Sequence, residues 1–337
     1  PFRPWPRPSC ARISGKISRI VSLKCYAAQG LVAELVDATD LKSVGLNNLV
    51  GSSPTSSTNA MSEKIDIVCV VGPTASGKTA AAIAIAKERH GEIISVDSRQ
   101  VYRTLNIGTE KISEEEMQGI PHHLLDVRDP QEVYTASDFV ADATRLIEDI
   151  HARGKLPILA GGTHFYFDAL LNGLPSTTPP NTALREELAA KSTEELFAEL
   201  LRLDPVRAHR IDPHNKRRLL RALEIIAHEG SVPERTRVET PYAVTWVVIN
   251  PPKEELLPRI VARLTDTLAR GLVEEVRSVK EAVGDERLRE LGLEYRVVGE
   301  YVDGKISEEE LLPILSNKLW QYARAQKKWL KRLMVAE

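Results

Sequence analysis

The residues with the clearest chemical meaning form one short segment that reads G-P-T-A-S-G-K-T. Its members are Gly72, Pro73, Thr74, Ala75, Ser76, Gly77, Lys78 and Thr79. The backbone N–H groups of such a turn converge on one point, the helix that follows adds positive potential, and the lysine supplies a point charge. The Thr79 hydroxyl is suited to hold a Mg²⁺ ion. The segment predicts a diphosphate or triphosphate ligand with magnesium as cofactor, and it leaves the reaction open.

Apolar runs and helical stretches alternate around this segment. The pattern predicts strands over 65–71, 92–96 and 156–160, with helices over 78–90 and 137–153. This order predicts a P-loop NTPase-like parallel sheet with helices on both faces. Ligands in such sheets bind at the carboxyl ends of the strands. Asp97 and Thr163 each follow a strand, as the phosphate loop does, so we expect all three on one edge of the sheet.

The second half of the chain reads as mostly helical after a proline-rich break at 175–180. Helices are expected over 182–203, 213–229, 253–281 and 306–332, and a strand over 243–249 is expected to return to the sheet. We therefore predict a P-loop core over 61–180, a helical insertion over 181–212, and a remainder over 213–337. The remainder holds the rest of the core and the C-terminal helices.

Composition restricts the class of protein. The chain has 337 residues, 42% of them hydrophobic, and a formal net charge of −2, so contact with a polyanion would need local basic patches. Two such patches occur, at 216–221 and along the C-terminal helix, where aromatic residues are interleaved with lysine and arginine. No apolar run approaches about 18 residues, which predicts no membrane span. Three cysteines give no disulfide framework, and the cytoplasm is the expected location.

Two other P-loop classes are alternatives to consider. A small-molecule kinase also combines a P-loop with a short second strand and a helical lid. However, the strand before Gly161 does not end in the acid that usually holds Mg²⁺ in P-loop NTPases. A nucleic-acid-binding ATPase is the second alternative. The missing acid favours a third possibility, a diphosphate that is bound without phosphoryl transfer.

Five motifs in order carry a resemblance to a known family. They are G-P-T-A-S-G-K-T, D-S-R-Q-V-Y (97–102), H-H-L-L-D-V (122–127), G-G-T-x-x-Y (161–166) and R-x-x-R-A-L-E (218–224). From about residue 65 to residue 329 the chain resembles the tRNA dimethylallyltransferases, also called tRNA isopentenyltransferases. The resemblance implies transfer of a dimethylallyl group from dimethylallyl diphosphate to N6 of the adenosine 3′ of the anticodon. The acceptors would be tRNAs that read codons beginning with U.

The resemblance also implies roles for individual residues. Asp97 would be the general base for the weakly nucleophilic exocyclic amine, with Arg263, Thr74 and Thr163 lining the diphosphate site. Contacts to the tRNA anticodon stem-loop are implied for Ser98, Arg99, Gln100, Arg185, Arg217, Arg218, Arg221, Arg324 and Lys328. Nothing suggests an obligate dimer, so a monomer is expected. Two departures from the family pattern, Ala325 and the element at 292–296, put some tRNA contacts in doubt.

Residues 1–60 differ from the rest of the chain. They open P-F-R-P-W-P-R-P, show no helical or strand period, and are followed by Met61. Codon degeneracy allows residues 30–58 to be back-translated into the stem-and-loop form of the anticodon and T arms of a tRNA gene. We therefore expect translation to start at Met61 and the first 60 residues to be non-native or disordered. An upstream nucleotide sequence that cannot fold as a cloverleaf would contradict this hypothesis.

Overall fold

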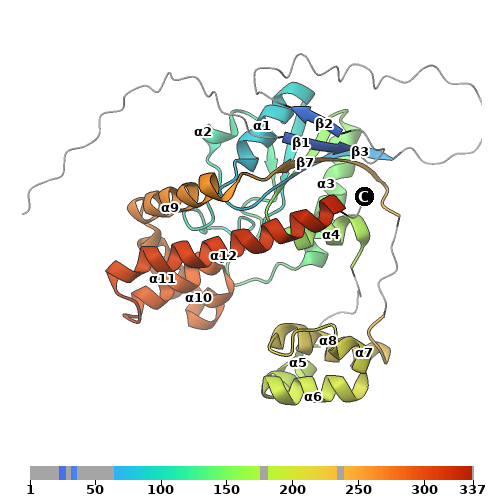
Figure 1. Cartoon of the computed structure of the whole chain (residues 1–337), viewed down its shortest axis with the longest axis vertical. Coiled ribbons are helices and arrows are strands. Elements are labelled where there is room, and N and C mark those ends of the chain that lie inside the picture. The colour runs from blue at the N-terminus through green and yellow to red at the C-terminus, as the bar shows by residue number, and fades with distance from the viewer. Residues whose placement is uncertain (1–22, 28–31, 36–63, 175–180, 234–238, 336–337) are drawn as a thin grey trace, which may run out of the picture.

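The computed structural model describes residues 23–27, 32–35, 64–174, 181–233 and 239–335 (Figure 1). The predicted break at 175–180 lies outside the described residues, as does most of 1–60. Among the described residues, no helix is long and apolar enough to cross a lipid bilayer.

A seven-stranded sheet with the order β2-β1-β7-β3-β6-β4-β5 forms the centre of the body. The strands are β1 Leu23–Ala27, β2 Val32–Leu35, β3 Ile65–Val71, β4 Gly91–Ser95, β5 His122–His123, β6 Leu156–Gly161 and β7 Tyr242–Ile249. The five strands from β7 to β5 run parallel, which confirms the predicted parallel sheet. The returning strand is also confirmed, because β7 pairs with β3 along its whole length. The two-residue strand β5 was too short to predict.

Two strands come from the segment that was expected to be non-native or disordered. β1 pairs antiparallel with β7, and β2 pairs antiparallel with β1. Without them the backbone groups on one side of β7 would lie at the edge of the sheet, where unpaired N–H and C=O groups invite pairing. The expectation therefore differs from the structure at 23–27 and 32–35, and the other residues of 1–60 lie outside the described part.

Alternation along β3 sends its side chains to two separate apolar clusters. Ile67, Cys69 and Val71 face the larger one, which includes residues of α3, α4 and α9 to α12. Val68 and Val70 face the smaller one, against α1. Successive side chains of a strand point to opposite faces, so this apolar run is buried on both sides. Helices therefore cover both faces of the sheet, as predicted.

The helices follow the sequence pattern with local differences. They are α1 Lys78–Arg89, α2 Glu114–Met117, α3 Ala136–Ala152, α4 His164–Asn172, α5 Thr182–Ala189, α6 Thr193–Leu203, α7 Pro205–Ala208, α8 Lys216–Glu229, α9 Lys253–Ala269, α10 Leu272–Glu290, α11 Leu293–Val302 and α12 Glu308–Val335. Figure 1 shows α12 running beside α11, with which it packs.

Two predicted helices are each broken into two. The helix expected over 182–203 stops after α5 because Ser192 caps a new helix, with its hydroxyl and the Glu195 carboxylate forming a capping box. The helix expected over 253–281 stops at Gly271, whose φ of 100° lies in the left-handed region. Helical periodicity in the sequence does not by itself reveal such short interruptions.

The helices α5 to α8 form a small unit with an apolar cluster of their own, set apart in Figure 1. Leu188, Leu196 and Leu200 pack there against Leu219 and Ile226 of α8. The insertion was predicted to end at residue 212, with the basic helix assigned to the core. The packing of α8 against α5 and α6 instead extends the insertion to Glu229.

A buried carboxylate lies near the amino end of β4. The Glu92 side chain is 3% exposed and accepts hydrogen bonds from Lys155 Nζ at 2.7 Å, from His123 Nε2 at 2.8 Å and from Arg153 Nη2 at 2.8 Å. These partners, with Arg153 first, hold the pKa of Glu92 well below its ordinary value of 4.5.

We expect Glu92→Gln to lower the free energy of unfolding by about 3 kcal/mol, because cations around the site lose their buried partner. The folded-state pKa is depressed, so the wild-type contribution is present above pH 4.5 and is lost as the pH falls below it. Urea denaturation at several pH values measures both effects. Asp129→Asn, which removes an exposed partner of Arg103, is the matched control and should change stability by less than about 1 kcal/mol.

Candidate active site

The phosphate loop connects β3 to α1. Its turn requires left-handed backbone at Ala75, with φ of 59°, and at Gly77, with φ of 94°. Lys78 folds back over the loop and donates a hydrogen bond from Nζ to the Pro73 carbonyl at 2.7 Å. The Ser76 hydroxyl is buried and has no hydrogen-bond partner among the described residues. A buried polar group without a partner costs free energy, so this hydroxyl is suited to a ligand oxygen in the loop.

A side-chain amide on α12 joins the phosphate loop to the turn after β6. Gln326 is 5% exposed; its Oε1 accepts from the Thr74 N–H at 2.9 Å, and its Nε2 donates to the Gly162 carbonyl at 3.0 Å. A Cβ on Gly162 would lie 2.7 Å from that amide nitrogen, so a larger residue there would displace the amide. The C-terminal helix is therefore bound directly to the edge where the site lies.

Asp97 and Thr163 meet at the same edge of the sheet. The Thr163 hydroxyl accepts from the Ser98 N–H at 3.1 Å, and the Thr163 N–H donates to the Val96 carbonyl at 3.2 Å. Asp97 Oδ1 accepts from the N–H groups of Arg99, at 2.8 Å, and Gln100, at 3.3 Å. Within the described part of the chain, Oδ2 receives no hydrogen bond, and it remains available as an acceptor.

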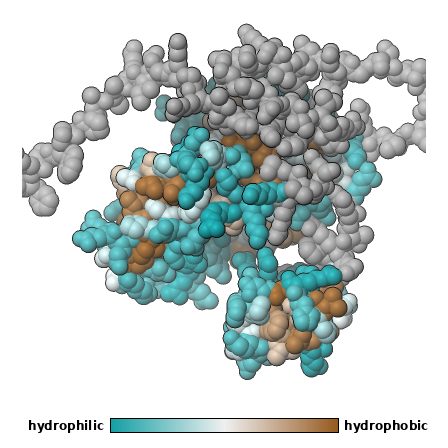
Figure 2. All heavy atoms as spheres, in the orientation of Figure 1, coloured by the Kyte–Doolittle hydropathy of each residue, from teal (hydrophilic) through white to brown (hydrophobic). Residues whose placement is uncertain are grey.

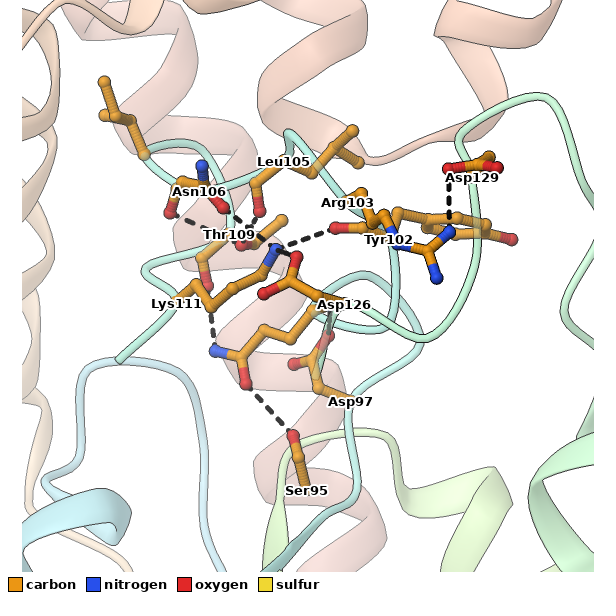
Figure 3. Close-up of polar contacts among 12 residues, drawn as sticks. Ser95, Asp97, Tyr102, Arg103, Leu105, Asn106, Thr109, Lys111, Asp126 and Asp129 are labelled. Carbon is orange, nitrogen blue, oxygen red and sulfur yellow. Dashed lines mark hydrogen bonds and ion pairs between the residues drawn. The ribbon is translucent and has the colours of Figure 1, made fainter. Parts of the chain in front are cut away.

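Figure 3 shows polar contacts of Ser95, Thr109 and Lys111 around the loop after Asp97, and the Gln100 side chain takes part in this network. Its Oε1 accepts from the Ser95 hydroxyl at 3.0 Å, and its Nε2 donates to the carbonyls of Thr109 and Glu110, each at 3.1 Å. Lys111, at the end of this loop, donates to the Tyr102 carbonyl at 2.7 Å. All of these bonds are internal to the protein, and the tRNA contact of Gln100 stays a prediction.

Arg263 reaches the phosphate loop from α9. Its Nη1 donates to the Thr74 hydroxyl at 2.8 Å, and its Nη2 lies 3.6 Å from Glu294 Oε1. Burial lowers the pKa of Lys78 to about 8, while the nearby charge of Asp97 raises it and that of Arg263 lowers it. Asp97, Arg263 and Lys78 therefore lie close enough to interact electrostatically, as expected for parts of one site.

The residues expected to contact tRNA differ in their surroundings. Arg185 Nε and Nη2 each lie 2.8 Å from the Glu224 carboxylate, which is 1% exposed in its side chain, and Arg221 lies 3.5 Å from the same group. These two arginines therefore have a structural partner inside the helical unit. The others, Arg217, Arg218, Arg324 and Lys328, are exposed, and Ser98 and Arg99 are half-buried beside Asp97. Their roles toward tRNA stay predictions.

Comparison with known proteins identifies the family. The family model described as IPP transferase matches residues 100–333. The chain belongs to this family. A tRNA dimethylallyltransferase from Thermomicrobium roseum is 42% identical over 288 residues, which cover 82% of this chain and 87% of the relative. One from Janthinobacterium is 40% identical over 289 residues, covering 81% of this chain and 91% of the relative.

Solved structures agree with this membership. The tRNA isopentenylpyrophosphate transferase from Bacillus halodurans aligns with a TM-score of 0.60 and 36% identity, over 80% of this chain and 87% of that one. A eukaryotic dimethylallyltransferase acting on tRNA aligns with a TM-score of 0.68 and 27% identity, over 79% of this chain and 69% of that one. The predicted P-loop NTPase-like fold and the assignment to prenyl-transferring enzymes are confirmed, and the kinase alternative is not supported.

Three site residues of this IPP transferase family member were not predicted. Gln326 lies in a basic helix that suggested only nucleic-acid contact. Glu294 falls in the element at 292–296 that departs from the family pattern. Glu275 accepts from the N–H groups of Asn106, Ile107 and Gly108 at 2.7 to 2.9 Å. Each of these side chains contacts residues far away in the sequence, and local sequence pattern does not reveal such contacts.

We expect Gln326→Leu to lower the free energy of unfolding by about 2 to 4 kcal/mol, because the Thr74 N–H and the Gly162 carbonyl lose their partner. Gln321→Leu, at an exposed position of the same helix, should change it by no more than about 0.5 kcal/mol. Chemical denaturation of both variants makes the comparison. Equal effects would show that the Gln326 amide contributes no more than an exposed one.

His164 begins α4 and stacks on Trp329 of α12, with ring centroids 4.3 Å apart and planes 9° apart. Burial, assisted by the charge of Lys78, lowers the pKa of His164 from 6.5 to about 4. In the unfolded chain this imidazole takes up a proton near pH 6.5, whereas the folded protein resists protonation. Stability should therefore decline as the pH falls from 6.5 toward 4.

The slope contributed by His164 should approach about 1.4 kcal/mol per pH unit in this window. His164→Gln should lose that part of the pH dependence, whereas His214→Gln, at an exposed position, should keep it. Urea denaturation between pH 7.5 and pH 5 measures the difference. Parallel pH profiles for wild type and His164→Gln would contradict the assignment.

Proposed function

We propose that the chain transfers a dimethylallyl group from dimethylallyl diphosphate to N6 of the adenosine 3′ of the anticodon, in tRNAs that read codons beginning with U. Family membership supports the reaction type. The observation that carries the proposal is that the phosphate loop after β3 and Asp97 after β4 lie at the same edge of the sheet, on either side of β6, close enough for the charge of Asp97 to raise the pKa of Lys78. An acceptor for a proton and a cradle for an anion thus lie on one edge of the sheet.

In this proposal Asp97 acts as the general base. Two backbone N–H groups fix Oδ1, and Oδ2 remains for the incoming amine. The exocyclic amine of adenine is a weak nucleophile because its lone pair is delocalised into the ring. A carboxylate that accepts its proton as the C–N bond forms lowers that barrier. The base has to leave its stack to reach Asp97, as enzymes that act on bases generally require.

The leaving diphosphate gains negative charge as the allylic C–O bond breaks. Lys78, Arg263 and the loop N–H groups are positioned to stabilise that charge, with the Ser76 hydroxyl as a further donor. Thr163 orders the neighbouring backbone through the Ser98 N–H. These groups make diphosphate a good leaving group without phosphoryl transfer.

The residues fit a magnesium ion that arrives with the donor. The Thr79 hydroxyl is exposed at the start of α1, and the described residues hold no group of three or more His, Cys, Asp or Glu that could bind a metal. Mg²⁺ commonly takes one or two protein ligands and completes its shell with phosphate oxygens and water. Thr79 would hold the ion together with the donor, and the ion would neutralise part of the leaving-group charge.

The acceptor surface in this proposal spans two parts of the chain. Arg217 and Arg218 are exposed on α8, and Arg324 and Lys328 are exposed on α12. Figure 2 shows mostly hydrophilic residues over the visible face of α12. Basic side chains on such faces supply affinity for phosphate groups. We propose that the enzyme works as a monomer in the cytoplasm on the anticodon stem-loop.

A labelled-donor assay tests the proposed function. Purified protein, labelled dimethylallyl diphosphate and total tRNA should yield labelled tRNA, and an isolated anticodon stem-loop should replace the whole tRNA. ATP should not be consumed with or without RNA. RNA-independent ATP turnover would support a small-molecule kinase, and RNA-stimulated ATP hydrolysis would support a remodelling ATPase.

We expect Asp97→Asn to reduce the transfer rate by about 10²- to 10⁴-fold, because the amide keeps the Oδ1 hydrogen bonds but does not take up the proton. Its affinity for tRNA should stay within about threefold of wild type, as measured by filter binding. Asp129→Asn is the control for a remote aspartate and should leave transfer unchanged. An Asp97→Asn enzyme with wild-type turnover would refute the general-base assignment.

A further inference from the structure

A second carboxylate, Glu294, lies within the site and is not used by the proposed chemistry. It belongs to the first turn of α11 and its side chain is 15% exposed. Burial raises the pKa of Glu294, and the charge of Asp97 adds to the rise, while Arg263 and Arg99 lower it. On the side of α12, the charge of Glu294 also raises the pKa of Tyr322. Glu294 thus faces the charged groups of the site rather than solvent.

The backbone that carries Glu294 is firmly anchored. The neighbouring Tyr295 is 1% exposed, and its hydroxyl donates to Glu275 Oε1 at 2.6 Å. The same carboxylate accepts the N–H groups of the loop at 106–108. A Cβ on Gly108 would come within 2.8 Å of the Tyr295 ring, so the two elements pack closely. This packing fixes the backbone that carries the preceding residue, Glu294.

Arg263 has few partners for a half-buried guanidinium. It donates to the Thr74 hydroxyl, and its Nε is buried with no hydrogen-bond partner among the described residues. Glu110 also acts on it electrostatically, but Glu110 is paired with Arg270. Glu294, at 3.6 Å from Nη2, is the ion-pair partner of Arg263 among the described residues. The separation is an ion pair without a hydrogen bond, so the guanidinium is compensated but not tightly bound.

We propose that Glu294 is the counter-ion of Arg263 when the donor is absent, and that it yields the guanidinium to the diphosphate when the donor binds. The inference rests on the proposed function, in which Arg263 binds the diphosphate. A diphosphate carries more negative charge than a carboxylate, so it replaces Glu294 as the partner of the guanidinium. The charge of Glu294 then repels the bound diphosphate. Glu294 therefore lowers the affinity of the site for diphosphate, including the diphosphate released by the reaction.

The experiment measures binding of inorganic pyrophosphate by titration calorimetry, in the presence of Mg²⁺. Glu294→Gln keeps the size and shape of the side chain and removes its charge. We expect it to bind pyrophosphate about fivefold more tightly than wild type, within the range of a single close charge. Glu255→Gln, which removes the exposed partner of Arg259 one turn away on α9, is the matched control and should bind as wild type does.

A double-mutant comparison assigns the effect to Arg263. Arg263→Gln should weaken pyrophosphate binding at least tenfold, and in that background Glu294→Gln should produce no further tightening beyond about twofold. In Arg263→Lys, which retains a positive charge, Glu294→Gln should still tighten binding. Thermal melting confirms that each variant is folded, and the isosteric Glu294→Gln change should melt at or above the wild-type temperature.

The outcomes distinguish the proposed role of Arg263 from that of Glu294. If Arg263→Gln leaves pyrophosphate affinity unchanged, the proposed role of Arg263 is wrong. If Arg263→Gln weakens binding but Glu294→Gln has no effect or weakens it, the counter-ion inference alone is overturned. Tightening that persists in full without Arg263 would also overturn it, because the carboxylate would then act on the ligand by itself.

Discussion

The site depends on one amide that joins three segments far apart in the sequence. Gln326 accepts from the N–H of Thr74 in the phosphate loop and donates to the carbonyl of Gly162 after β6. Both partners are backbone groups, so the interaction fixes the course of two turns rather than the position of a side chain. Trp329 lies one turn further along α12, and its stacking on His164 adds a flat contact between α12 and α4. Helix α12 is therefore part of the architecture of the donor site as well as a candidate tRNA surface.

Around this attachment the site balances opposite charges in a partly buried setting. Lys78 and Arg263 supply positive charge, and Asp97 and Glu294 supply negative charge beside them. Charges interact strongly where water is excluded, and each group shifts the protonation of the others. The lowered pKa of Lys78 shows that burial outweighs its acidic neighbour before a ligand arrives. A bound diphosphate would reverse that balance.

The sequence predicted the elements that follow from local pattern. The bounds of β3 agree with the apolar run at 65–71, and Asp97 and Thr163 meet at one edge because parallel strands end together. Local sequence pattern did not predict the interactions between distant segments. Gln326 has no period or motif that points to Thr74, and no local pattern predicts that the Gln100 amide donates to the carbonyls of Thr109 and Glu110. The helix breaks at Ser192 and Gly271 depend on single residues within otherwise continuous periodicity.

The separate apolar cluster of α5 to α8 has a consequence for how such an enzyme changes over evolutionary time. The unit enters the chain after α4 and leaves it before β7, and its leucines pack on one another rather than on the sheet. No residue of this cluster belongs to β3 or β7, whose pairing lies outside the unit. Selection can therefore change this unit while the sheet and the strand ends that carry the candidate site stay the same.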